Sequence, residues 1–362
     1  MKVLFLIPGL GIGGAEKNSV FLANSFIEKG IDVSISIFNG QKDLLSDLSP
    51  KVKVFEYRTL KLRNSIIPII KIINIYSPDV VIGNMWPMTF YCFISYLFSF
   101  KKFKLIMVEH IFLSLGLKDS FLLEKIIARL VHLIFRFTKI RFIAVSDGVK
   151  EDLTNYYKLN EKQIVVISNP VINGLPDYIN LNNFNIDFKK TYVRILSVGN
   201  LKPQKDYPTL LHSLVILKKI GVNFLCTIIG EGGERNKIEH LIVKMDLVEN
   251  VRLLGSVKNL SYYYTNCDIF VMSSSYEGFG NVLVEALSFG CRIVSTDCNS
   301  GPSFILDNGK YGKLAKTSNP DNLAITILES LNLTINTDLI RERSKLFDIN
   351  CISNLYINEI RG

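Results

Sequence analysis

Short apolar runs alternate with longer stretches of helical periodicity along most of the chain. Runs such as Val3–Ile7 and Ile269–Met272 are apolar throughout, which is typical of strands buried on both faces of a parallel sheet. Because strands and helices alternate, the pattern predicts an α/β protein with doubly wound parallel sheets. The expected strands are Val3–Ile7, Asp32–Phe38, Val52–Glu56, Val80–Gly83, Leu105–Val108, Phe142–Val145, Ile164–Ile167, Arg194–Val198, Phe224–Ile229, Val251–Leu253, Ile269–Met272 and Arg292–Ser295. The expected helices are Ala15–Lys29, Ile66–Ile75, Met88–Phe98, Leu122–Phe137, Gly148–Tyr157, Pro208–Ile220, Arg235–Met245, Leu260–Asn266, Val282–Phe289 and Pro320–Asn332.

The length of 362 residues is large for one hydrophobic core, so two domains are expected. The polar stretch Asn173–Lys190 has little periodicity and is interpreted as the linker between them. The N-terminal domain then covers residues 1–172, and the C-terminal domain covers residues 190–347. Ligands of doubly wound sheets bind beyond the carboxyl ends of the strands, where the glycine-rich segments of this chain lie.

The net charge of +9 favours an anionic partner, such as a nucleotide, a nucleic acid or an acidic membrane surface. Nucleic acid is disfavoured because the chain has no zinc, RRM or helix-turn-helix pattern. The six cysteines are scattered without a CxxC pair, which favours reduced thiols in a cytoplasmic protein. The apolar run before Pro8 is short and is interpreted as a strand rather than a signal peptide. Met85–Phe100 is shorter than the roughly twenty residues that a transmembrane helix needs.

The segment Ser273–Leu306 carries the most chemistry. Glu277 precedes a glycine turn that ends at Gly280, and an apolar helix starts at Asn281. A helix N-terminus behind such a turn offers free N–H groups and a positive dipole end, which suits a phosphate. Glu285 shares a helix face with Asn281, so its carboxylate lies one turn behind, where a ribose diol could bind. The arrangement suits a nucleoside diphosphate that carries a sugar.

This segment resembles the E-x7-E signature of retaining glycosyltransferase family 4, a family of glycosyltransferase group 1 with the GT-B architecture. Further blocks match the family in the same order: Gly9–Lys17, Val198–Lys205, Gly230–Gly232, Arg252–Val257 and Asp268–Ser273. The resemblance implies two Rossmann-like domains that face each other across a cleft. It also implies that the C-terminal stretch 348–362 packs back on the first domain.

The resemblance implies roles for the matching residues. Glu285 accepts hydrogen bonds from the ribose hydroxyls, Glu277 binds hydroxyls of the transferred sugar, and Lys205 offsets charge on the leaving diphosphate. His110, at the end of a strand, lines the sugar site, although spacing does not decide between it and its neighbour Glu109. The other residues implied in donor binding are Gly13, Gly14, Asn200, Gly280, Asn281 and Val282.

Two positions depart from the family pattern. Asn200 stands where the family commonly has arginine, so either Lys202 or the helix N-terminus at Asn281 compensates, or the diphosphate is held less tightly. Phe304 stands where the family usually has glutamate, which leaves the role of that position unassigned.

The run Gly9–Gly14 also satisfies G-x-G-x-x-G after a strand, which raises an NAD-dependent oxidoreductase as a rival. That fingerprint needs an acid at the end of the second strand to bind the ribose. The second strand ends in Ile35–Asn39 and has no acid there, so the rival is disfavoured.

A basic stripe marks the helix predicted over Leu122–Phe137. Its members Lys125, Arg129, His132 and Arg136 are spaced by four, three and four residues, so they share one face. Residues 101–141 contain nine Lys or Arg and three Asp or Glu. The stripe is either the solvated face of a buried crossover helix or a contact with an anionic membrane leaflet.

Together these features predict a retaining glycosyltransferase (hexosyltransferase) that moves a sugar from a nucleotide diphosphate sugar, with a UDP-sugar as the first choice. The acceptor is a hydroxyl of a glycan or lipid-linked glycan, in bacterial surface polysaccharide synthesis, and the protein is cytoplasmic or peripheral on the inner face of the membrane. No cofactor is expected and no metal site is apparent. Two alternatives share the fold: a GT-B-like sugar-nucleotide epimerase and a non-catalytic protein that binds sugar or membrane.

Overall fold

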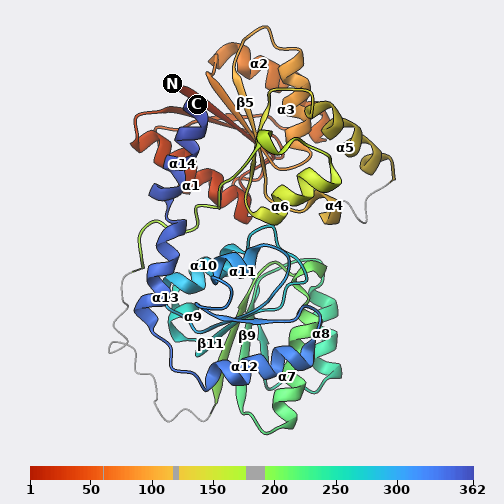
Figure 1. Cartoon of the computed structure of the whole chain (residues 1–362), viewed down its shortest axis with the longest axis vertical. Coiled ribbons are helices and arrows are strands. Elements are labelled where there is room, and N and C mark those ends of the chain that lie inside the picture. The colour runs from red at the N-terminus through yellow and green to blue at the C-terminus, as the bar shows by residue number, and fades with distance from the viewer. Residues whose placement is uncertain (60, 117–121, 177–191) are drawn as a thin grey trace. The chain divides into compact units, whose positions relative to one another are not determined.

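The computed structural model describes residues 1–59, 61–116, 122–176 and 192–362. The chain forms two compact units, each built around its own sheet (Figure 1). Unit 1 comprises Met1–Asn173 and Phe347–Gly362, and unit 2 comprises Gly174–Leu346. Of the predicted linker, residues 177–190 lie outside the described part of the chain.

The sheet of unit 1 has seven parallel strands in the order β3-β2-β1-β4-β5-β6-β7. The strands are β1 (Lys2–Ile7), β2 (Asp32–Ile37), β3 (Lys53–Glu56), β4 (Val80–Asn84), β5 (Lys104–Glu109), β6 (Arg141–Ala144) and β7 (Ile164–Val166). The chain proceeds from β1 to β2 and β3 on one side and then places β4 to β7 on the other. The neighbours β1 and β4 therefore form the topological switch point, where loops diverge at the carboxyl ends.

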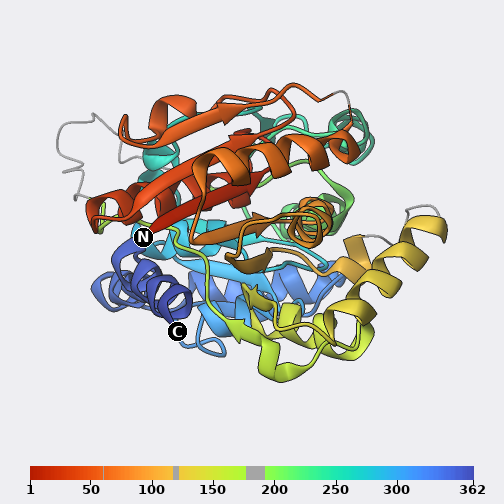
Figure 2. The same cartoon turned by 90° about the horizontal axis from the view of Figure 1, so that it is seen from above.

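Helices connect these strands, as a parallel sheet requires. They are α1 (Gly14–Glu28), α2 (Ile66–Tyr76), α3 (Met88–Leu97), α4 (Leu113–Gly116), α5 (Leu122–Phe135) and α6 (Asp147–Glu151). The helix α5 lies at the outer margin of unit 1 in both views (Figures 1 and 2).

The last helix, α14 (Ile349–Arg361), packs on unit 1 beside α1 (Figure 1). The hydroxyl of Ser25 on α1 donates a buried hydrogen bond to that of Ser353 at 2.9 Å. Glu359 pairs with Arg141 at the start of β6, with 2.7 Å between Oε1 and Nε. The end of the chain thus completes the first unit.

The sheet of unit 2 has six parallel strands in the order β10-β9-β8-β11-β12-β13. They are β8 (Val193–Val198), β9 (Phe224–Ile229), β10 (Val251–Leu253), β11 (Ile269–Met272), β12 (Ile293–Thr296) and β13 (Lys313–Ala315). The helices are α7 (Tyr207–Lys219), α8 (Arg235–Lys244), α9 (Ser261–Asn266), α10 (Asn281–Ser288), α11 (Gly301–Ile305), α12 (Pro320–Leu331) and α13 (Thr337–Ser344). The core between sheet and helices includes Ile195, Leu214, Ile228, Val271 and Leu323.

All predicted strands are present, and their ends differ from the prediction by at most one residue. Among the described residues, the prediction did not include β13, α4, α11, α13 and α14 as elements. β13, α4 and α11 are short and α13 is mostly polar, so these four have no strong apolar period. The stretch that forms α14 was expected to pack on the first domain, but it was not predicted as a helix. The helix predicted over Gly148–Tyr157 is α-helical only as far as Glu151 and continues as a π-helix over Asp152–Tyr156. There the buried Asp152 carboxylate accepts a hydrogen bond from the Ser114 amide at 3.1 Å.

Candidate active site

The switch point of unit 2 lies between β8 and β11, which pair directly through Ile195 and Ile269. Chain segments leave these two strands in opposite directions, and the carboxyl ends of such strands are where open α/β sheets bind ligands. Asn200 and Lys205 follow β8, and Glu277 follows β11. The fold therefore brings these three predicted residues to one edge of the unit 2 sheet.

An ion pair joins the segments that follow these two strands. Lys205 Nζ lies 2.6 Å from Glu277 Oε1, and the two side chains are only 15% and 9% exposed. The Ser274 hydroxyl donates to the same carboxylate oxygen at 2.6 Å. The Glu277 carboxylate is thus held by a cation and a hydroxyl, which together fix its orientation.

The loop that carries Lys205 is fastened to the serine run after β11. Lys205 ends a short 3-10 turn, Pro203–Lys205, and its carbonyl accepts a hydrogen bond from the Ser273 hydroxyl at 2.8 Å. The Ser275 amide donates to the Gln204 carbonyl, also at 2.8 Å. These contacts hold the backbone of Gln204 and Lys205, so the fold of both loops sets the point from which the Lys205 side chain starts.

Two glycines are required by this geometry. Gly280 has φ of +103° directly before α10, a conformation that side chains with a Cβ rarely adopt. At Gly230, after β9, a Cβ would lie 1.9 Å from the carbonyl oxygen of Gly199, after β8. The loops at this sheet edge therefore pack backbone against backbone, which leaves main-chain groups close to any ligand bound there.

The helix α10 starts at Asn281, and Asn281 and Val282 are half-buried at its N-terminus. Glu285 lies one turn further along, and its Oε2 accepts a hydrogen bond from the hydroxyl of Tyr264 at 2.9 Å. Tyr264 is buried on α9, and its ring stacks on Phe289 with centroids 5.3 Å apart. Burial and the nearby Glu285 raise the pKa of Tyr264 well above its usual value, so the phenol stays protonated and donates. Glu285 is thus oriented by a rigid partner.

The other predicted site residues belong to unit 1. Gly13 precedes α1 with extended backbone angles, and Gly14 is the first residue of that helix. The loop follows β1 at the switch point of the unit 1 sheet, and it is held by hydrogen bonds between the backbones of Leu10 and Gln41 and of Leu44 and Leu10. Of the predicted site residues, Gly13, Gly14 and His110 accordingly belong to unit 1, and the others belong to unit 2.

His110 and Glu109 at the end of β5 have different environments. His110 is half-buried, and its Nε2 lies 3.3 Å from Asn84 Oδ1 at the end of the neighbouring β4. Burial lowers the pKa of His110 to about 4, partly offset by a hydrogen bond with Asn169, so the ring is neutral at neutral pH. Glu109 is fully buried, and its Oε1 accepts from the Thr89 hydroxyl at 3.0 Å. Spacing left the choice between the two open; burial places Glu109 inside unit 1 and favours His110 as the residue nearer the surface.

The two departures from the family pattern are both on the surface of unit 2. Asn200 and Lys202 are exposed in the loop after β8. Phe304 is 45% exposed on α11, and the guanidinium of Arg343 lies 5.7 Å from the centre of its ring. An apolar ring with a cation over it cannot replace a carboxylate as a hydrogen-bond acceptor.

Three positioning residues were not anticipated: Ser274, Tyr264 and Asn84. Ser274 could have been suspected, because a run of small polar residues directly follows a buried strand. Tyr264 gave no such signal, since it stands among other tyrosines on a short helix and only burial distinguishes it. Within the described ranges, no group of three or more His, Cys, Asp and Glu side chains could hold a metal ion.

The chain has two doubly wound parallel-sheet units, and the glycine-containing loops at the carboxyl ends of their strands are suited to binding a ligand. This architecture is that of the GT-B class of α/β proteins. Two family models match the chain: Glycosyltransferase Family 4 over residues 12–172 and Glycosyl transferases group 1 over residues 179–346. The protein belongs to the group 1 glycosyltransferases with the GT-B fold.

Individual relatives agree with this membership. The chain is similar to N-acetylgalactosamine-N,N'-diacetylbacillosaminyl-diphospho-undecaprenol 4-alpha-N-acetylgalactosaminyltransferase of Campylobacter jejuni, with 29% identity over 214 residues. That match covers 56% of this chain and only 55%, about half, of the Campylobacter protein. The lipopolysaccharide core biosynthesis glycosyltransferase LpsE of Rhizobium meliloti is 24% identical over 326 residues, or 87% of this chain and 84% of LpsE. The structure of HepE of Anabaena in complex with UDP and glucose is similar to this chain, with a TM-score of 0.81 and 19% sequence identity. The superposition covers 100% of each of the two chains, which shows that they share the fold.

Proposed function

We propose that the protein transfers a sugar from a nucleotide diphosphate sugar, most simply a UDP-sugar, to a hydroxyl of a lipid-linked glycan, with retention at the anomeric carbon. The observation that carries the proposal is the arrangement after β8 and β11. Lys205 is paired with Glu277, and Glu285 is anchored one turn inside the helix that follows Gly280. A cation, a helix N-terminus and a carboxylate are what a diphosphate and a ribose diol require.

In the proposed donor complex, the ribose hydroxyls donate to Glu285, whose carboxylate Tyr264 holds in place. The diphosphate lies at the N-terminus of α10, near Asn281 and Val282, within reach of Lys205. Lys205 has three N–H donors, and Glu277 occupies one of them. The remaining donors can meet the diphosphate without breaking the ion pair. Structures of a relative with the same fold in complex with UDP and glucose support a UDP-sugar.

In the proposed reaction, the bond between the anomeric carbon and the diphosphate oxygen breaks while the acceptor oxygen attacks from the same face of the sugar. The acceptor proton passes to the departing diphosphate oxygen. Glu277 is already engaged by Lys205 and Ser274, which suits a carboxylate that binds sugar hydroxyls better than one that attacks the sugar. Lys205, the helix dipole and the backbone amides meet the growing charge, and no metal or other cofactor takes part in the proposal.

The proposed acceptor carries a lipid, and the proposed place of action is the cytoplasmic face of a membrane, in the synthesis of a surface polysaccharide. The names of two relatives support this assignment, since one includes diphospho-undecaprenol and the other includes lipopolysaccharide core biosynthesis. His110, as a neutral imidazole, would donate or accept a hydrogen bond at the sugar and would not supply a positive charge.

The test is a two-stage assay. UDP-, GDP- and ADP-sugars are first screened for thermal stabilisation of the protein, with Glu285→Ala as the binding-deficient control. The best donor is then incubated with a polyprenyl-diphosphate-linked sugar, with and without EDTA, and the anomeric configuration of the product is determined by NMR. We expect a product with the donor's configuration at the same rate in EDTA. Inversion, or conversion of the donor without any acceptor, would reject the proposal, the latter in favour of an epimerase.

A further inference from the structure

The helix α5 is apolar on two opposite sides. Its inner side packs into unit 1 through Ala128, Val131 and Phe135, which are buried. The ring of Phe135 meets that of Phe93 on α3 edge to face, with centroids 4.6 Å apart. The helix is thus attached to the core of unit 1 by its inner side.

The outer side of α5 carries a second set of apolar residues, which we name the outer ridge. Its members are Ile126, Leu130, Leu133, Ile134 and Phe137, and all of them are exposed. Leu130 is 56% exposed, and Phe137, in the turn that follows the helix, is 82% exposed. At about 100° per residue these positions lie opposite the buried side. The periodicity alone was compatible with a helix buried by its apolar face; the structure shows that one apolar face is outside.

A second exposed apolar segment ends at the same edge of unit 1. The strands β5 and β6 are parallel neighbours, so the helices that lead into them, α3 and α5, end at the same edge of the sheet. After α3, Phe98 is 66% exposed and Phe100 is 95% exposed. The ends of the two helices therefore offer Phe98, Phe100 and Phe137 to whatever covers the outer ridge.

Cations accompany these apolar residues. Lys125, Arg129 and Arg136 follow one flank of α5, between the outer ridge and the buried side, while the side chain of His132 lies outside the described residues. At the shared edge, Lys101, Lys102 and Lys139 are exposed. This pattern, apolar side chains outward with cations along the flank, is that of a helix lying in a lipid interface.

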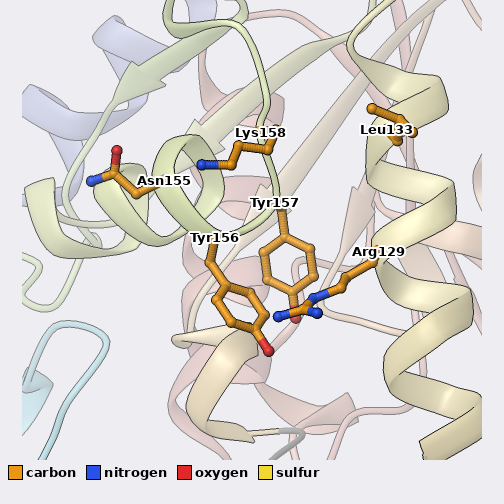
Figure 3. A pocket seen from close by; sticks show the side chains of 6 residues that line it. All are labelled: Arg129, Leu133, Asn155, Tyr156, Tyr157 and Lys158. Carbon is orange, nitrogen blue, oxygen red and sulfur yellow. The ribbon is translucent and has the colours of Figure 1, made fainter.

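A pocket of about 430 Å³ lies on the cationic flank (Figure 3). It is lined by Arg129 and Leu133 from α5 and by Asn155, Tyr156, Tyr157 and Lys158 from the π-helix and the residues after it. The guanidinium of Arg129 lies 4.3 Å from the centre of the Tyr156 ring, which holds it at the pocket. The pocket thus brings the cations Arg129 and Lys158 near Leu133 of the outer ridge. Both cations could bind the phosphate of a lipid headgroup there.

Two alternatives to contact with a membrane surface fit less well: a helix that spans the membrane, and a second copy of the chain. Among the described residues, no helix is long and apolar enough to span a bilayer, and α5 itself has 14 residues. A second copy of the chain would bring two cationic flanks together, and like charges that face each other oppose association. Charge complementarity therefore favours an anionic surface.

We propose that the outer ridge, with Phe98 and Phe100, inserts into the interface of an anionic lipid membrane while the flanking Lys and Arg side chains bind lipid headgroups. The proposed function explains why the protein would bind a membrane, and the proposal rests on it in that respect alone. The surface itself is independent of the donor site. The proposal differs from simple electrostatic attraction to a leaflet, because apolar insertion is the main contact.

The first test is flotation with vesicles of phosphatidylcholine and phosphatidylglycerol, without donor or acceptor. We expect binding at low salt that decreases in high salt but does not vanish, because only the headgroup contacts are screened. Leu130→Glu combined with Phe137→Glu should weaken binding at both salt concentrations by about tenfold or more. Arg136→Gln combined with Lys139→Gln should weaken only the low-salt binding. Val243→Glu on α8, at a residue 66% exposed in unit 2, is the matched control and should bind as the wild type does.

The second test is a depth measurement with Phe137→Trp, whose signal is separated from that of Trp86, the one native tryptophan, by comparison with the wild type. We expect a blue shift on vesicle binding and quenching by brominated acyl chains. Absence of flotation at low salt, or unchanged binding of the Leu130→Glu and Phe137→Glu variant, overturns the proposal. If the wild type binds no vesicles but sediments as a dimer, and the variant sediments as a monomer, the outer ridge is a self-association surface instead. Activity on a lipid-free acceptor, measured in parallel, reports on the proposed function separately.

Discussion

Lys205 and Glu277, separated by 72 positions in sequence, form one ion pair at the switch point of the unit 2 sheet, with 2.6 Å between Nζ and Oε1. The pair couples the loop after β8 to the loop after β11. The residue proposed to bind the diphosphate, Lys205, is therefore in direct contact with the residue proposed to bind the sugar, Glu277. Both side chains are nearly buried. Removing either charge therefore leaves the other poorly solvated, which affects the stability of unit 2 as well as catalysis.

Lys205→Met should lower kcat by about 10²-fold and change the donor KM less, because charge on the diphosphate grows as the glycosidic bond breaks. Steady-state kinetics with varied donor separates the two parameters. Lys219→Met, at an exposed position on α7, is the control. A variant with a raised KM and a normal kcat would show that Lys205 only binds the ground state.

The same pair predicts a specific pattern of stability. Lys205→Met and Glu277→Gln should each destabilise unit 2, with the loss bounded by the roughly 3–5 kcal/mol known for fully buried pairs. The double variant should lose less than the sum, because neither charge is then left alone. Additive changes in the free energy of unfolding would mean that the contact contributes nothing to folding.

Tyr264→Phe should weaken UDP binding by about 0.5–1.5 kcal/mol, because Glu285 loses the hydrogen bond that orients it. Glu285→Ala should cost about 1.5–3 kcal/mol, as expected for a charged acceptor. In the Glu285→Ala background, Tyr264→Phe should have little further effect, since it acts through Glu285. Titration calorimetry measures all of these, and Tyr262→Phe, exposed on the same helix, is the matched control. Equal losses for Tyr264→Phe in both backgrounds would assign Tyr264 a general packing role.

The strands could be predicted closely because most of them are short, largely apolar runs that lie buried on both faces of a sheet. The elements that were missed, such as β13 and α13, are stabilised by neighbours in space and not by their own pattern. The outer ridge was missed for a related reason. In α5 both sides are apolar, and periodicity does not tell which side meets the core.

In the site, too, some features could be predicted from the local sequence and others depend on the three-dimensional fold. The resemblance to a family placed Glu277, Lys205 and Glu285 as candidates, and each of them lies at a strand end or on the helix that follows. Spacing within one helix predicted that Asn281 and Glu285 share a face. It could not predict contacts between separate loops, such as Lys205 with Glu277, or between α9 and α10, such as Tyr264 with Glu285. These depend on the order of the strands, which the sequence does not state directly.

Asn200→Arg tests the first departure from the family pattern. Asn200 is exposed after β8, so an arginine can be accommodated there without displacing core residues. A guanidinium near the diphosphate should strengthen donor binding or raise kcat by about tenfold, the value of one charged hydrogen bond. Donor titration and steady-state rates decide this. Lys202→Gln should be tested beside it, because a loss there that Asn200→Arg restores would identify Lys202 as the present substitute. No gain in Asn200→Arg would show that the site needs no second cation.

Glu109→Gln should change how the stability of unit 1 depends on pH. Burial raises the pKa of Glu109 from 4.5 to about 8, with a further contribution from the nearby Asp152, while hydrogen bonds from Thr89 and the Trp86 backbone act in the opposite direction. The native carboxyl thus stays protonated in a range where the unfolded chain ionises it. Its stabilising contribution is complete below pH 4.5 and is lost as pH rises toward 8, by about 1.4 kcal/mol per pH unit. The glutamine variant, which cannot ionise, should lose less stability than the wild type between pH 5 and 8. Calorimetric melting at both pH values measures the difference, and Glu151→Gln, an exposed acid of the same unit, is the control. If wild type and Glu109→Gln lose stability in parallel over this range, Glu109 is ionised in the native protein and a cation or water must reach it.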